Sequence, residues 1–143
     1  TGSALALEYV SRGSAFGDYD NDGDWDVFVV NLDDRATLMR NDGGNKNNWL
    51  YVSLVGSTDT SDGVGALIEI NSGANNQWRR VHGSGSYLSH SDLRAHFGLG
   101  QVQRVESIKI NWRTGSVQTV QDIPSNCLLV VYQDGDHEVV PLR

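Results

Sequence analysis

Along Glu106-Ser107-Ile108-Lys109-Ile110-Asn111-Trp112, polar and apolar side chains alternate residue by residue. Successive side chains of a β-strand point to opposite faces of a sheet, so this segment predicts a strand whose isoleucines and tryptophan lie on a buried face. Thr114-Gly115 follows, and the alternation resumes over residues 117–121. Because glycine tolerates the positive φ of a tight turn, the two segments predict an antiparallel hairpin.

The same kind of pattern continues on both sides of this hairpin. Asp134-Gly135 separates two further β-branched runs, and short runs of this type recur between glycine, asparagine and aspartate clusters. Helical periodicity is hard to find, so we predict an all-β fold with an antiparallel, sandwich-like sheet unit. The predicted strands are residues 26–31, 37–40, 49–55, 66–70, 77–82, 105–112, 117–121, 128–133 and 138–142.

Two polar segments interrupt the predicted strands. Residues 41–48 are all polar or glycine and cannot pack into a core. They predict a boundary between an N-terminal calcium-loop hairpin unit, residues 1–47, and a larger β domain, residues 48–143. Residues 122–126 predict a connecting turn, because Pro124 has no N–H to donate to a sheet ladder.

The composition limits the classes of partner. The chain has 143 residues, the length of one domain, and its 16 glycines against 2 prolines indicate many tight turns. Its formal net charge of −7 disfavours nucleic acid, and no apolar run approaches the ~20 residues of a membrane span. Cys127 lies in an apolar run and is expected to be an inert core residue. Because the chain begins at Thr1 without Met, we expect a mature form or a fragment.

The most distinctive segment is the acidic loop Asp18-Tyr19-Asp20-Asn21-Asp22-Gly23-Asp24-Trp25-Asp26. Calcium takes about six to eight oxygen ligands, and a tight loop can turn alternate carboxylates inward. Carboxylates crowded in this way repel one another unless a cation neutralises them. Gly23 allows the sharp turn that closes the shell. The predicted ligands are the carboxylates of Asp18, Asp20, Asp22 and Asp26 and the backbone carbonyl oxygen of Asp24.

Related metal sites fit this loop less well. An EF-hand has a glutamate at its twelfth position and a helix on either side, whereas Val29 occupies that position here and residues 26–30 predict a strand. Magnesium prefers few carboxylates and retained waters, so four carboxylates with a carbonyl favour Ca²⁺. A solvated acidic turn without a metal is the remaining alternative.

Two family resemblances cover nearly the whole chain. Residues 13–26 resemble an FG-GAP/VCBS-type repeat, and residues 38–43 and 48–50 resemble the end of such a repeat. These repeats form calcium-bearing blades of β-propellers, as in integrin α-chains. The remainder resembles an ASPIC/UnbV domain on three segments, which are Gly63-Val64-Gly65-Ala66, residues 83–91, and His96-Phe97-Gly98-Leu99-Gly100 leading into residues 105–112.

These resemblances imply a calcium-binding, non-catalytic module for adhesion or recognition, secreted or at the cell surface. Its implied partner besides calcium is an extracellular protein or a glycan. A propeller needs several blades, so a chain with one calcium hairpin is expected to be the C-terminal piece of a longer FG-GAP repeat protein. The alternative is an accessory domain of a secreted enzyme whose catalytic domain lies outside this chain. Sequence before Thr1 would discriminate the two.

The residues up to about Arg40 are expected to form a two-stranded hairpin, which by itself is marginal in water. We therefore expect this segment to be ordered only by calcium and by docking against the larger unit or a neighbouring chain. Something must then cover its apolar side chains, which are Phe28, Val30 and Leu38.

The residue pattern does not favour catalysis. No histidine belongs to an H-x-x-x-H pair or lies near a cysteine, so structural roles are expected for His82, His90, His96 and His137. Several serines lie near His90 and Asp92, namely Ser84, Ser86, Ser89 and Ser91, but none belongs to the G-x-S-x-G turn that presents a hydrolytic serine. Asp59 and Asp62 could suggest the acid and base of a glycosidase, but nothing else in the sequence indicates a sugar-binding cleft. Core or sheet-face positions are expected for the tryptophans, which are Trp25, Trp49, Trp78 and Trp112.

Overall fold

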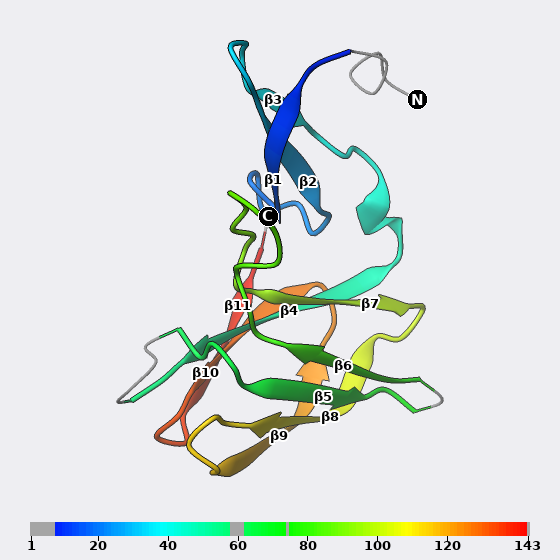
Figure 1. The fold of residues 1–143 in the computed structure, drawn as a ribbon. Coiled ribbons are helices and arrows are strands. Elements are labelled where there is room, and N and C mark those ends of the chain that lie inside the picture. The colour runs from blue at the N-terminus through cyan, green and yellow to red at the C-terminus, as the bar shows by residue number, and fades with distance from the viewer. Residues whose placement is uncertain (1–7, 58–61, 74, 143) are drawn as a thin grey trace.

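A computed structural model describes residues 8–57, 62–73 and 75–142 of the chain. These residues form β-strands and a short 3₁₀ helix, η2 (Gly44–Lys46), and contain no helix long and apolar enough to cross a membrane. The strands build three sheets (Figure 1). The predicted all-β class is confirmed. The strands are β1 (Ser11–Gly17), β2 (Asp26–Asn31), β3 (Thr37–Met39), β4 (Asn48–Val55), β5 (Leu67–Asn71), β6 (Asn76–Arg80), β7 (Ala95–Gly100), β8 (Arg104–Asn111), β9 (Val117–Pro124), β10 (Cys127–Tyr132) and β11 (His137–Pro141).

Two four-stranded sheets form a sandwich, the lower part of the molecule in Figure 1. One sheet has the strand order β11-β10-β4-β7 and the other β6-β5-β8-β9. Their apolar side chains meet in one core, and burial of each large side chain contributes about 1.5–3 kcal/mol. This core is therefore the main source of stability in the structure. Its fully buried members include Leu50, Ile68, Phe97, Ile108 and Leu129.

The two predicted hairpins are confirmed. β8 pairs with β9, and β10 pairs with β11, both antiparallel. In the connecting turns, Gly115 has a φ of +93° and Gly135 a φ of +119°. Three further pairs join strands that are not consecutive in the chain: β4 with β7 and β5 with β8, both antiparallel, and β4 with β10 in parallel. Parallel strands need a long crossover connection, so no local turn signal indicates this pair.

Two strands and one strand end differ from the prediction. β1 and β7 lie outside the predicted strands, and residues 122–124, expected in a turn, belong to β9. Pro124 pairs with Arg104 at the end of β9, which is an edge strand of its sheet. A proline is tolerated there, because an edge strand does not need every N–H in the ladder.

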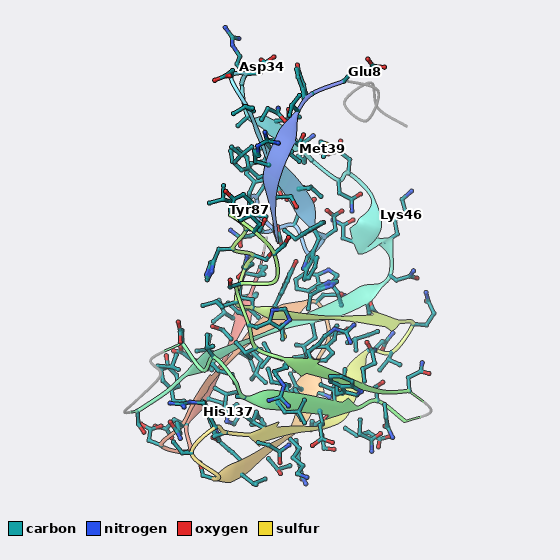
Figure 2. All side chains as sticks on the ribbon, viewed as in Figure 1. Glu8, Asp34, Met39, Lys46, Tyr87 and His137 are labelled. Carbon is teal, nitrogen blue, oxygen red and sulfur yellow. The ribbon has the colours of Figure 1, made fainter. Side chains whose placement is uncertain are left out.

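β1, β2 and β3 form a separate antiparallel sheet above the sandwich, and Figure 2 places Asp34 at its far end. The predicted N-terminal hairpin is present and is part of a larger sheet: β2 pairs with β3, and β1 adds a third strand that was not predicted, with Ala15 opposite Phe28. No hydrophobic side chain of residues 8–48 is buried. The sheet therefore lacks an apolar core. The buried side chains of this unit are instead polar, namely Asp18, Asp24, Asp26 and Asn31.

Residues 41–48, the predicted boundary, fold back over the acidic loop. The backbone N–H groups of Gly43 and Gly44 donate to the carboxylate of Asp24, at 3.2 and 2.9 Å. The side chain of Asn45 donates to the carbonyl oxygen of Asp22 at 2.9 Å. Because β4 begins in this segment, the acidic loop is held against the start of the sandwich.

Candidate metal centre

The acidic loop connects β1 to β2, and its backbone turns sharply. Asn21 and Gly23 have positive φ angles of 58° and 99°. Glycine adopts such angles at little cost, because it has no Cβ. A Cβ added to Gly23 would also overlap the indole ring of Trp49 on β4. Glycine is therefore needed here both for the turn and for the approach of the tryptophan.

Three of the predicted ligand residues come together in the loop. Asp18, Asp20 and Asp22 each offer one carboxylate oxygen, and these oxygens lie within 4.8 Å of one another. Oxygen ligands bind Ca²⁺ at about 2.3–2.6 Å, so oxygens on different sides of one ion are separated by distances of this order. Among the described residues, this is the one group of histidine, cysteine or acidic side chains with such spacing.

Backbone N–H groups orient most carboxylates of the loop, and Asp22 accepts one from Asp24 at 3.1 Å. Asp18 accepts hydrogen bonds from two N–H groups of its own loop, at 3.1 and 2.9 Å. Asp26 accepts from the N–H of Tyr19 at 3.1 Å and from that of Asn41 at 2.9 Å. Each carboxylate oxygen has two lone pairs, so these bonds leave acceptor capacity for a cation. The oxygen-only donor set is therefore compatible with Ca²⁺.

Asp24 combines two roles. One carboxylate oxygen accepts the N–H groups of the segment 41–48, whereas Oδ1 is buried and has no hydrogen-bond partner among the described residues. Burial raises the pKa of this carboxyl, and the bond from Gly44 opposes the shift. The predicted ligand atom, its carbonyl oxygen, accepts a long hydrogen bond of 3.4 Å from the Tyr51 hydroxyl. Sequence reasoning missed the anchoring role of the side chain, because its partners lie in a separate segment.

Asp20 has the fewest anchors of the three clustered carboxylates. Its nearest cation is the Arg40 guanidinium, at 4.0 Å. Loss of solvent contact, followed by the neighbouring carboxylates of the loop, raises the pKa of Asp20. The like charges therefore disfavour ionisation at this position, and a bound cation would relieve their repulsion.

The sandwich supplies a residue that sequence reasoning missed, Arg94. It donates to the carbonyl oxygen of Asp18 at 3.0 Å and to Oδ1 of Asn21 at 2.9 Å. Asp92 holds the guanidinium through an ion pair of 2.6 Å, and the guanidinium carbon lies 4.9 Å from the ring centre of Tyr51. The sequence offers one hint of this role, namely that Asp92 stands two residues before Arg94. An acidic residue this close to an arginine is too common to indicate a site.

The segment before β7 attaches β1 to the sandwich. Asp92 donates its N–H to the carbonyl oxygen of Phe16 at 2.8 Å. The hydroxyl oxygens of Ser89 and Ser91 accept the N–H groups of Ser14 and Phe16, at 3.1 and 3.2 Å. These serines thus stabilise β1, an edge strand. Their observed contacts are structural, whereas a hydrolytic interpretation would have given them a catalytic role.

His96 is packed between the acidic loop and the sandwich. Its ring centre lies 5.8 Å from that of Trp25 and 4.7 Å from that of Tyr51. Burial lowers the pKa of His96, while the backbone of Gly23 opposes the shift. The predicted role as a packed framework residue agrees with this position.

The other residues weighed as sites are scattered. His82, His90 and His137 are exposed, and Asp59 lies outside the described residues. Cys127 is buried, as expected. Of the tryptophans, Trp49 and Trp112 are buried, whereas Trp25 and Trp78 are 40% and 65% exposed.

Comparisons with known proteins agree with the resemblance seen in the larger unit. The family model described as "ASPIC and UnbV" matches residues 56–138, more than half of the chain. Cartilage acidic protein 1 of Mus musculus is 28% identical over an alignment of 145 residues, gaps included, and this alignment covers 96% of this chain and 22% of that protein. For cartilage acidic protein 1 of Homo sapiens, the identity is 30% over an alignment of 122 residues, which covers 81% of this chain and 18% of that protein. The chain thus spans about a fifth of the length of these relatives. It belongs to the ASPIC and UnbV family.

Proposed function

We propose that this chain is a calcium-binding, non-catalytic extracellular module for adhesion or recognition. The observation that carries the proposal is the composition of the N-terminal unit, in which Asp18, Asp24 and Asp26 are buried while no apolar side chain is. Burying carboxylates without a compensating charge is costly. A cation held by the loop would offset that cost.

The calcium site we propose is of the FG-GAP/VCBS type. Its support is the geometry of the loop, with clustered carboxylate oxygens and a glycine at positive φ. The similarity to cartilage acidic protein 1 supports an extracellular location. The chain covers 22% and 18% of the length of those relatives, and this supports a module that works beside other domains of a longer protein.

A non-catalytic role is supported by the surroundings of the candidate acid–base groups. An activated nucleophile needs a base within hydrogen-bond reach, and the base needs a third group to orient it. Ser89 and Ser91 instead accept backbone N–H groups of β1. We expect generic ester, phosphate and glycoside substrates to remain intact. Turnover that disappears in His90→Ala or His96→Ala would contradict this part of the proposal.

The test of the metal site is a calorimetric titration of chelator-stripped protein with Ca²⁺. The most informative variant is Asp20→Asn, because Asp20 contributes to the carboxylate cluster with few contacts to the rest of the loop. We expect calcium affinity to fall by at least about tenfold, while thermal unfolding in chelator stays at the wild-type temperature or moves above it, because the change removes one of the repelling charges. Magnesium should bind more weakly than calcium.

Asp34→Asn is the matched control. Asp34 lies at the far end of the same sheet (Figure 2), and the asparagine oxygen can still accept the N–H of Arg35. This variant should bind calcium as the wild type does. Absence of calcium binding at millimolar concentrations in the wild type, or equal affinities in Asp20→Asn and Asp34→Asn, would refute the proposed site.

A further inference from the structure

A pocket of about 370 Å³ lies where the three-stranded sheet meets the sandwich. Its lining includes Phe16 of β1, Trp25 of the acidic loop, and Arg79 and Arg80 of β6. The segment between β6 and β7 closes it, and Figure 2 shows Tyr87 of that segment beside the three-stranded sheet. The volume lies at the small end of the ~300–1,000 Å³ range of small-molecule sites.

The charge of this pocket is opposite to that of the chain. The formal net charge is −7, yet the lining contains three arginines and one acidic residue, Asp92. Asp92 is already paired with Arg94 at 2.6 Å. Among the described residues, neither Arg79 nor Arg80 belongs to an ion pair. Residues that pair across strands share a face of the sheet, and Arg79 pairs with the buried Ile68 whereas Arg80 pairs with Leu67. The two side chains therefore point to opposite faces of β6, and the guanidinium of Arg79 is the one available to an anion in the pocket.

Both arginines are held in place without losing their donors. One Nη of Arg80 donates to the carbonyl oxygen of Gly65 at 2.9 Å, and one Nη of Arg79 donates to that of Trp78 at 2.8 Å. The guanidinium carbon of Arg79 also lies 5.5 Å from the ring centre of Phe97. A guanidinium has five N–H donors in a fixed plane, so each arginine retains donors suited to a carboxylate or a sulfate.

Two aromatic residues of the lining are open to solvent. Phe16 and Trp25 are 41% and 40% exposed, and their ring centres are 6.1 Å apart. The apolar C–H face of a sugar ring packs on such aromatic surfaces, while hydroxyl groups meet polar side chains such as Ser86, which also lines the pocket. Aromatic faces in the same pocket as the guanidinium of Arg79 therefore match a ligand that has both a sugar face and a negative charge.

We propose that this pocket binds an acidic saccharide, one or two sugar rings that carry a carboxylate or a sulfate. This inference gives a ligand class to the recognition module proposed above and rests on that function. The compact volume favours a short saccharide over an extended peptide, which would need a longer groove along a strand. Trp25 belongs to the acidic loop, whereas the arginines belong to the sandwich, so the saccharide and calcium sites are adjacent but use different side chains.

The experiment is a titration of the ¹⁵N-labelled chain, in calcium and in chelator, followed by NMR. The probes are a uronate-containing disaccharide, a sulfated disaccharide, a neutral disaccharide of the same ring type, and tetraglutamate as an acidic peptide. At least one acidic disaccharide should shift the signals of the Trp25 indole and of Arg79, and should bind at least about tenfold more tightly than the neutral sugar. The two acidic sugars distinguish a carboxylate from a sulfate.

Arg79→Gln should weaken binding of the acidic sugar by about tenfold, because it removes charge-assisted hydrogen bonds. Arg80→Gln, at the neighbouring position but on the opposite face of β6, should bind the sugar as the wild type does. Arg104→Gln is the matched control, since Arg104 is an exposed arginine of β8 that pairs with Asp122 and does not line the pocket. It should bind as the wild type does. Unchanged thermal unfolding and calcium titrations of all three variants show that they are folded.

The saccharide proposal is overturned if neutral and acidic sugars bind equally, if no sugar binds at high millimolar concentration, or if tetraglutamate binds as tightly as the acidic sugar. Equal affinities in Arg79→Gln and in Arg104→Gln would overturn it as well. The calcium titration tests the metal site independently of the saccharide titration. Calcium binding without saccharide binding would reject the pocket alone, whereas saccharide binding without calcium binding would reject the metal site and leave the pocket.

Discussion

The guanidinium of Arg94 donates a hydrogen bond of 3.0 Å to the backbone carbonyl oxygen of Asp18, and this bond links the acidic loop to the sandwich. The same guanidinium donates to Asn21 and is held by Asp92. It therefore fixes the loop at its first carboxylate residue and at its turn. A rigid loop presents its oxygens to a cation without the entropy loss of ordering a mobile one.

Arg94→Lys should weaken calcium binding about three- to tenfold and lower the free energy of unfolding by about 1–3 kcal/mol. Lysine keeps the positive charge but cannot make the forked contacts to Asp18, Asn21 and Asp92. The measurements are calcium calorimetry and denaturant unfolding. Arg104→Lys, at an exposed ion pair of the sandwich, is the control and should change neither quantity appreciably. Equal behaviour of the two variants would show that Arg94 contributes charge alone.

Gly23→Ala should destabilise the chain by about 2–5 kcal/mol in chelator. The positive φ of 99° costs an alanine about 1–2 kcal/mol, and the overlap of its Cβ with Trp49 adds the cost of overpacking, about 1–3 kcal/mol. Gly115→Ala separates the two effects, because Gly115 has a similar φ of 93° but no atom within 4 Å of an added Cβ. Gly115→Ala should therefore lose only the free energy that the positive φ costs, about 1–2 kcal/mol. Similar unfolding free energies for both variants would mean that Trp49 moves aside freely.

The thiol of Cys127 should react slowly with a disulfide reagent in the native chain. The side chain is 4% exposed, its thiol donates to the carbonyl oxygen of Pro124 at 3.1 Å, and burial raises its pKa. A raised pKa means that less thiolate, the reactive form, is present at any given pH. We expect labelling at pH 8 to be at least about tenfold slower than in denaturant. Equal rates would place Cys127 outside a stable core.

The strands of the sandwich were predictable where one face is buried and the other is exposed to solvent, because apolar and polar residues then alternate in the sequence. In β8, Ile108 and Ile110 are fully buried and Lys109 is exposed, so the burial follows the sequence pattern. β7 escaped prediction because its outward positions include Gly98 and Gly100, and glycine is a poor strand former. Its buried positions, Ala95, Phe97 and Leu99, do alternate. A pattern search that ignored propensity would therefore have found this strand.

β1 could not have been predicted from local signals. Ser11–Gly17 has few residues of high strand propensity, and its order comes from pairing with β2 and from the hydroxyl groups of Ser89 and Ser91. The candidate site was also predictable only in part. The spacing of its carboxylates could be predicted because they lie in one short loop. The contacts of Arg94 and of Asp24 could not, because they join segments that are distant in the sequence.

Calcium should protect the three-stranded sheet from hydrogen exchange more than it protects the sandwich. The sheet buries no hydrophobic side chain, and Phe28, Val30 and Leu38 are exposed, so the acidic loop and its contacts must supply most of its stability. A ligand that binds only the folded form stabilises it by about 2.7 kcal/mol at a hundred times its dissociation constant.

The measurement compares amide exchange of residues 11–39 with and without chelator, and residues 104–111 of β8 serve as the internal control. We expect up to about a hundredfold slower exchange of the sheet amides in calcium, and little change in β8, whose apolar residues Ile108 and Ile110 are buried without the help of a metal. Equal exchange of residues 11–39 in both conditions would show that the serine and arginine contacts hold the sheet without a cation. A parallel change in both regions would show that the two units unfold together, since local opening of the sheet alone would leave β8 protected.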